Sequence, residues 1–360
     1  MPYTPQNLSA AETEEARRTA ARLIAHYRED SAEYPAELAN HLPMLLPILA
    51  QLGASSQRLE EYATLYRQIR RQPAMPRPLA PFTPADWQEG LGDRRREADY
   101  RRFFAGEVAR LGPEGAVRAY LPRLMQAAGS SAFHPLMRLA FGILRSDADE
   151  IAIALGFWAT TELPLRNEPQ GPQGQESPAQ LLDFMRQSPA FSAIDIPATA
   201  PLWHWMRGVG GMDAFAPLLG RLSPAPETLD AVGAAGLALF AAAPGSLEAV
   251  HAMTGGWWVR VVGQWLDAPA DLARFFWQAV LAVYPKTGMP ALPPAEELAA
   301  LRAAPAPPRA ALAAAALACD PWGDDEEHHP SVVFTAFQEY DRTGDRLYLN
   351  AAAKRMGLLD

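Results

Sequence analysis

The stretch NHLPMLLPILAQLGAS, residues 40–55, sets the pattern for the rest of the chain. It is apolar from Leu42 onward and carries Pro43 where a first helical turn tolerates proline, which predicts a helix over 40–52. Similar short segments, bounded by Pro, Gly, Asp or Ser, follow along the chain and account for its 34 prolines. Signals for strands are scarce. The sequence therefore predicts an all-α fold.

Helix signals recur from the N-terminus to the C-terminus. Ser9 and Glu12 have the spacing of a capping box, and helical periodicity follows over 16–27. The β-branched run VRVV at 259–262 is interpreted as part of a Trp-rich helix. Further helices are predicted over 56–71, 94–110, 114–127, 135–145, 148–161, 178–187, 227–242, 246–254, 257–266, 269–284, 295–303, 308–319, 332–341 and 346–356.

Two segments are predicted to be long loops. Residues 72–84 (QPAMPRPLAPFTP) are rich in proline, and residues 167–178 (NEPQGPQGQESP) are polar and rich in Gly and Pro. Either segment would also serve as a domain linker. Because candidate ligands lie on both sides of each loop, we expect one multi-helical domain over residues 1–360. An α-solenoid is the second interpretation, but no motif recurs at a fixed period.

Composition limits the functional class. The chain has 360 residues, a hydrophobic fraction of 49% and a net charge of −9, which fit a globular protein with a substantial core and argue against nucleic-acid binding. A single cysteine, Cys319, excludes an internal disulfide and fits a reducing compartment. We find no signal peptide and no apolar run long enough to span a membrane. We therefore expect a cytoplasmic protein with no membrane partner.

Four of the seven histidines lie in apolar or helix-forming surroundings: His41, His134, His251 and His328. A buried imidazole without a partner costs about 1–3 kcal/mol, and one metal ion would satisfy all four at once. Each also has a simpler interpretation. His41 fits a core residue or a helix cap, and His134 fits a helix cap. His251 fits a hydrogen-bonded core residue, and His328 fits a solvated loop. The acidic run 324–327 before His328 would orient a ligating imidazole by accepting its second N–H.

Other candidates are weaker. His329 and His204 are the rivals for a ligand position, and His26 has the polar neighbours of a surface residue. Asp213 stands where a third glycine would complete a dinucleotide fingerprint after GVGG (208–211), so the sequence shows no flavin or NAD site. Cys319 is interpreted as a small buried residue. Several tryptophans would line a flat aromatic pocket or fill the core: Trp203, Trp205, Trp257, Trp258 and Trp277.

In this order, the histidine segments resemble the questin oxidase family. The resemblance rests on NHLPMLLPILAQLGAS (40–55), SSAFHPLMRLAFGI (130–143), AVHAMTGGWWVRVV (249–262), FFWQAVLAVY (275–284) and FQEYDRTGDRLYLNAA (337–352). It extends from about residue 15 to residue 356, with a diverged middle at 165–225.

The resemblance implies an all-helical oxygenase of secondary metabolism that inserts oxygen into, or cleaves, a ring of a polycyclic phenolic substrate of the anthraquinone type. Its implied cofactor is ferrous iron, held by the histidines that correspond to His41, His134, His251 and His328. Imidazole-rich sites also suit zinc, copper and nickel, so iron follows from the family alone. Dioxygen and an aromatic compound would be the partners. Arg138 lies one helical turn after His134 in the sequence, and from this proximity alone we predict that it stabilises a phenolate as a catalytic residue.

One position departs from the family pattern. Near the last histidine the family reads D-E-H-x-I-K, and the lysine there can contribute a carbamate to the metal site. Ser331 stands at that position here, and the only lysines, Lys286 and Lys354, lie elsewhere. Four neutral imidazoles would leave the metal charge uncompensated unless Asp325, Glu326, Glu327, water or substrate supplies an anion. The alternative function is therefore a helical binding or interaction protein that kept the fold without the metal chemistry.

Overall fold

The computed structural model describes residues 8–167, 174–323 and 326–359. These residues contain 17 α-helices and one two-stranded sheet, which confirms the predicted all-α fold. They form two compact units, which we describe separately. Unit 1 combines residues 1–75 with residues 293–360, and unit 2 comprises residues 76–292. The first boundary falls inside the predicted loop 72–84, which contains no helix. The single domain over 1–360 stays a prediction.

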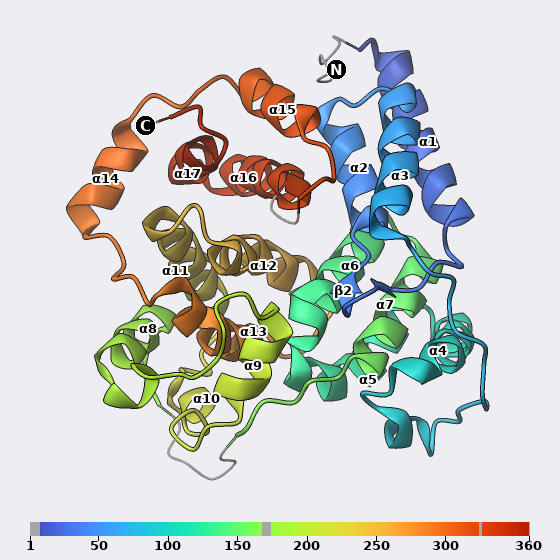
Figure 1. The fold of residues 1–360 in the computed structure, drawn as a ribbon, viewed down its shortest axis with the longest axis horizontal. Coiled ribbons are helices and arrows are strands. Elements are labelled where there is room, and N and C mark those ends of the chain that lie inside the picture. Colours follow the sequence, from blue (N-terminus) through green and yellow to red (C-terminus); the bar gives the residue numbers. More distant parts are fainter. Residues whose placement is uncertain (1–7, 168–173, 324–325, 360) are drawn as a thin grey trace. The chain divides into compact units, whose positions relative to one another are not determined.

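Unit 1 is a bundle around α2 (Leu42–Leu52), whose residues are buried except Gln51. Helix α2 is in contact with its sequence neighbours α1 and α3 and with α15 and α16 from the other end of the chain (Figure 1). The remaining elements of unit 1 are α1 (Ala10–His26), β1 (Glu33–Tyr34), β2 (Leu38–Ala39), α3 (Ser56–Arg70), α14 (Ala295–Ala303), α15 (Arg309–Ala318), the 3₁₀ turn η7 (Glu326–His328), α16 (His329–Thr343) and α17 (Leu347–Arg355).

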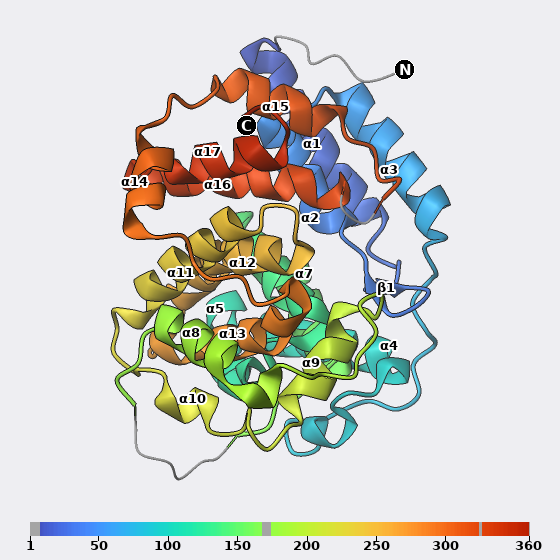
Figure 2. The same cartoon turned by 60° about the vertical axis from the view of Figure 1, so that its left-hand side comes forward.

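Unit 2 is built around α12 (Leu247–Gly263), which packs against α11 and α13 (Figure 2) and against α6 (Figure 1). A second layer pairs α7 with α4, α5 and α6. The helices of unit 2 besides α12 are α4 (Glu97–Leu111), α5 (Pro113–Leu124), α6 (His134–Leu144), α7 (Ala148–Thr160), α8 (Pro178–Gln187), α9 (Leu202–Gly210), α10 (Leu218–Arg221), α11 (Thr228–Ala242) and α13 (Pro269–Val283). Short 3₁₀ turns are η1 (Trp87–Gly90), η2 (Arg94–Arg96), η3 (Met125–Ala127), η4 (Ser130–Phe133), η5 (Pro189–Phe191) and η6 (Tyr284–Thr287).

Helix α12 corrects the prediction of two helices over 246–254 and 257–266. It runs unbroken through Gly255 and Gly256. A Cβ at Gly255 would lie 2.3 Å from the Phe276 ring, and one at Gly256 would lie 3.1 Å from Gly233 Cα. The two glycines therefore serve close packing against α13 and α11, and they do not end the helix. The run 259–262 is helical, as predicted.

The tight contact between α11 and α12 at Gly236 predicts that an added methyl group there lowers stability. A Cβ at Gly236 would lie 2.3 Å from the backbone oxygen of Ala252, so Gly236→Ala would force the two helices apart. We expect this substitution to lower the free energy of unfolding by about 1–3 kcal/mol. Gly106 in α4 is the matched control, because a Cβ there meets nothing within 4 Å. Gly106→Ala should raise stability by about 0.5–1 kcal/mol, and chemical denaturation of both variants would reveal equal effects if the packing argument were wrong.

The structure confirms one smaller feature of the predicted fold and adds others that were not predicted. The capping box is confirmed, with Glu12 N donating to Ser9 Oγ and Ser9 N donating to Glu12 Oε2. The hairpin β1–β2 was not predicted, because strands of two residues leave no alternating pattern in a sequence. Helices α9 and α10 were also missed. Of the predicted loop 167–178, residues 168–173 lie outside the described part of the chain.

Within the described residues, no helix combines the length and the apolar character that crossing a bilayer would require.

Candidate metal centre

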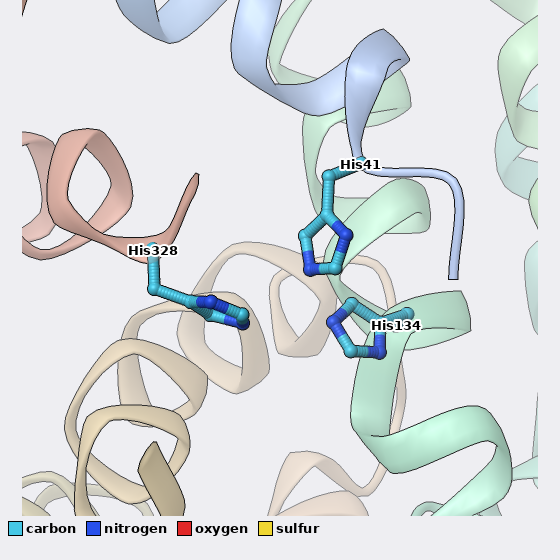
Figure 3. Close-up of side chains that lie close together, drawn as sticks. All are labelled: His41, His134 and His328. Atoms are coloured by element: carbon cyan, nitrogen blue, oxygen red, sulfur yellow. The ribbon is translucent and has the colours of Figure 1, made fainter. Parts of the chain in front are cut away.

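Unit 1 brings two of the predicted ligands together. His41 caps α2 at its N-terminus, and His328 occupies the same position before α16. Their ring centroids lie 4.9 Å apart in an edge-to-face arrangement, and both side chains are buried (Figure 3). Helix α2 is in contact with α16, so the packing of the bundle joins residues that are 287 positions apart in the chain.

Local hydrogen bonds fix His41. Its backbone N–H donates to the Tyr66 hydroxyl at 2.8 Å, and its Nδ1 lies 2.8 Å from the carbonyl oxygen of Ala39 at the end of β2. Asn40, the residue before it, accepts from Leu42 N and donates to Ser31 O. The short hairpin and α3 therefore hold the His41 ring at the start of α2. Sequence patterns did not identify Tyr66 as part of this site.

Unit 2 brings the other two ligands together. His134 is the first residue of α6, and His251 lies in the middle of α12. Their ring centroids are 5.3 Å apart, again edge to face, and both are buried. Phe133 and Trp258 flank the His251 ring, with centroid separations of 5.8 Å and 6.4 Å. The pair therefore lies beside two flat aromatic side chains. Phe133 directly precedes α6, and Trp258 lies in α12.

A strained turn presents His134. Ser131, Ala132 and Phe133 have φ values of 41°, 53° and 72°, three consecutive non-glycine residues in the left-handed region. Each such residue raises the free energy of the folded state by about 1–3 kcal/mol, and it persists only where the surrounding structure holds it in place. The turn places the Ser131 carbonyl oxygen 2.5 Å from His134 Nδ1. The geometry of this turn therefore orients the imidazole.

Backbone carbonyls determine the tautomer of three histidines. His41, His134 and His251 each direct Nδ1 at a carbonyl oxygen, that of Leu247 in the case of His251. A carbonyl oxygen only accepts, so Nδ1 carries the proton and the lone pair of each neutral ring is on Nε2. This is the arrangement of metal-ligating histidines. Burial lowers the pKa of His251, which keeps that ring neutral. The donor set of the described residues therefore fits a transition metal ion.

The predicted rival ligands have other environments. His204 lies exposed on α9 and stacks on Trp203, and His26 is exposed at the end of α1. His329, in α16, is half-buried, with Nδ1 3.4 Å from Cys319 Sγ. Cys319 is itself half-buried, less enclosed than its sequence suggested.

Arg138 is buried in an ion pair that the sequence did not predict. Its Nε donates to Glu150 Oε2 at 3.0 Å and its Nη2 donates to Glu150 Oε1 at 3.3 Å, linking α6 to α7. Both side chains are 2% exposed. This pairing compensates the guanidinium charge inside the unit. The role of Arg138 toward a phenolate stays a prediction.

The acidic run and the family's lysine position are only partly described. Asp324 and Asp325 lie outside the described residues. Glu327 is buried, with Oε1 3.4 Å from His41 Nδ1 and Oε2 3.1 Å from Arg70 Nη2. Ser331 is buried one helical turn after His328, and among the described residues its Oγ has no hydrogen-bond partner. The carboxylate near the histidines thus comes from Glu327.

A comparison with protein families agrees with these observations. The family model described as Questin oxidase-like matches residues 38–334, a segment that contains all four histidines. A search of curated proteins found no match. The match covers most of the chain, with all of unit 2 and part of unit 1. The chain therefore belongs to the Questin oxidase-like family.

Proposed function

We propose that this protein is a metal-dependent oxygenase that uses dioxygen to insert oxygen into, or cleave, a ring of a polycyclic phenolic compound of the anthraquinone type. Family membership supports an oxygenase-type function in general. The observation that carries the metal dependence is the buried histidine pair in each unit. In three of these four rings a backbone carbonyl fixes the proton on Nδ1, which leaves Nε2 to coordinate.

In this proposal one ion is shared by the two pairs. His41 and His328 of unit 1 and His134 and His251 of unit 2 would all be ligands of that ion. The proposal requires the units to bring their pairs to the same ion. Imidazole suits iron, zinc, copper and nickel alike, and the family is the reason for assigning ferrous iron. When bound, the metal supplies the activation of dioxygen.

The chain's own residues would hold the ligands and the substrate. The Ala39, Ser131 and Leu247 carbonyls keep three imidazoles in the coordinating tautomer. Phe133 and Trp258 offer flat faces beside His251, against which an aromatic ring would stack. Arg138 would favour the phenolate form of a substrate hydroxyl, although its pairing with Glu150 compensates much of its charge. Burial of the histidines would exclude bulk water from the reacting centre.

A second candidate function follows from Ser331. A buried serine at the family's lysine position provides neither a charge nor a carbamate. This observation favours a binding or interaction protein that kept the helical fold and lost the metal chemistry. Such a protein would contain no metal, and chelators would not change its stability.

Elemental analysis of the chain purified without oxygen separates these functions. The oxygenase predicts about one iron per chain, and oxygen uptake should then be screened with hydroxylated anthraquinones. Full occupancy by another metal would retain the site and change the reaction class. A metal-free protein, even after incubation with Fe(II), would favour the binding protein. An absorbance spectrum of the same sample would reveal any bound flavin.

A further inference from the structure

Glu327 is a buried carboxylate placed between a candidate ligand and a cation. Its side chain is 2% exposed, and its two oxygens face different groups. Oε1 lies 3.4 Å from His41 Nδ1, and Oε2 lies 3.1 Å from Arg70 Nη2. A buried carboxylate without compensation is strongly disfavoured, so the Arg70 contact stabilises the charged form. Glu327 therefore places a carboxylate that is paired with a guanidinium next to the ring of His41.

Arg70 is fixed from more than one side. It is the last residue of α3, with its guanidinium carbon 5.3 Å from the centre of the Tyr34 ring in β1. It also donates to the carbonyl oxygen of Gly323, four residues before Glu327. The hairpin, α3 and the segment leading to α16 thus meet at one guanidinium. This arrangement sets the position of the carboxylate.

A phenol on α3 belongs to the same cluster, since Tyr66 is fully buried beside His41. The Tyr66 hydroxyl is the group that accepts from His41 N–H.

The His41 ring directs Nδ1–H at the Ala39 carbonyl oxygen, and the Glu327 carboxylate lies 3.4 Å from the same nitrogen. A carboxylate on the outer nitrogen of a ligating histidine fixes the ring, increases its basicity and offsets part of the metal charge. Four neutral imidazoles provide no such charge, and Ser331 provides none either. The acidic run was expected to orient the histidine that follows it, whereas this carboxylate faces His41.

We propose that Glu327, held by Arg70, is the positioning residue for His41 and supplies the negative charge that the four imidazoles lack. This inference rests on the proposed metal site. It assigns to Glu327 the electrostatic part of the task that the family's lysine would perform through a carbamate, without requiring Glu327 to coordinate the metal.

The test measures the metal dissociation constant of Glu327→Gln by competition with a chromogenic chelator, with Fe(II) and with Co(II) as the probes. We expect binding about 10–100-fold weaker than in the wild type. Glu339→Gln is the matched control. Glu339 is equally buried and paired with Arg342, but it lies in α16 eleven residues after His328, about 16 Å along the helix. Its loss should leave metal affinity unchanged.

A double variant separates positioning from a merely structural role. Glu327→Gln alone leaves Arg70 buried without its carboxylate, which would itself destabilise the fold. Glu327→Gln with Arg70→Gln removes both charges, so unfolding of the metal-free protein should move back toward the wild type while metal affinity stays low. Metal affinity that is restored in the double variant, or that is unchanged in Glu327→Gln, would overturn the role of Glu327 but not the proposed function. A wild type that binds neither Fe(II) nor Co(II) would overturn the proposed function together with it.

Discussion

Alanine at any one of His41, His134, His251 or His328 should lower metal content well below one ion per chain. Each substitution removes a ligand, and the expected loss of affinity exceeds the roughly 10–100-fold that removing an outer partner costs. His251→Ala is the most informative member, since His251 lies in mid-helix, where a hydrogen-bonded core histidine is the simpler interpretation. Metal per chain by elemental analysis, with far-ultraviolet circular dichroism to confirm folding, measures the effect.

Two exposed histidines provide the controls for this series. His26 lies at the end of α1 in unit 1, and His204 lies on α9 in unit 2. Alanine at either position should leave metal content unchanged. Full metal content in two or more variants of the four buried histidines would defeat the ligand assignment. Loss of metal only from variants in one unit would restrict the site to that unit's pair.

Breaking the Arg138–Glu150 pair should have the largest effect on stability. Both side chains are 2% exposed, so Arg138→Met would leave the Glu150 carboxylate buried without its cation. A broken buried pair typically costs about 3–5 kcal/mol. The charge network is wider, because burial lowers the pKa of nearby Arg101 and the charges of Arg138 and Glu150 also act on it. Denaturant unfolding of Arg138→Met, Glu150→Gln and the double variant measures the coupling.

The same variants separate a structural role from a catalytic role for Arg138. If its main contribution is the ion pair, the double variant should recover much of the stability and also the oxygen uptake. If Arg138 acts on a phenolate, stability should return while oxygen uptake stays low. Arg186, in an exposed pair with Asp183, is the control, and Arg186→Met should change stability by less than about 1 kcal/mol. A loss of similar size at Arg186 would contradict the burial argument.

Helix bounds were predicted correctly where local residues alone determine where the helix starts and ends. The helices over 178–187 and 295–303 have the predicted bounds. The prediction of a helix end was wrong where glycines serve the close packing of one helix against another. Gly255 and Gly256 resemble a helix end in the sequence, but the neighbouring Phe276 ring and Gly233 backbone show why no side chain fits there. A single sequence does not distinguish a glycine that ends a helix from a glycine that allows two helices to pack closely.

The sequence by itself determined the all-α class and singled out four histidines that are buried in the structure, because helix periodicity and apolar surroundings are local properties. Tertiary structure alone decided which histidines are neighbours: His41 with His328, and His134 with His251. It also decided the charge environment, pairing Glu327 with Arg70 and Arg138 with Glu150. Apart from Arg138–Glu150, which links the consecutive helices α6 and α7, these contacts join segments distant in the chain, and their formation depends on the packing of whole helical faces. No spacing in the sequence encodes that packing directly.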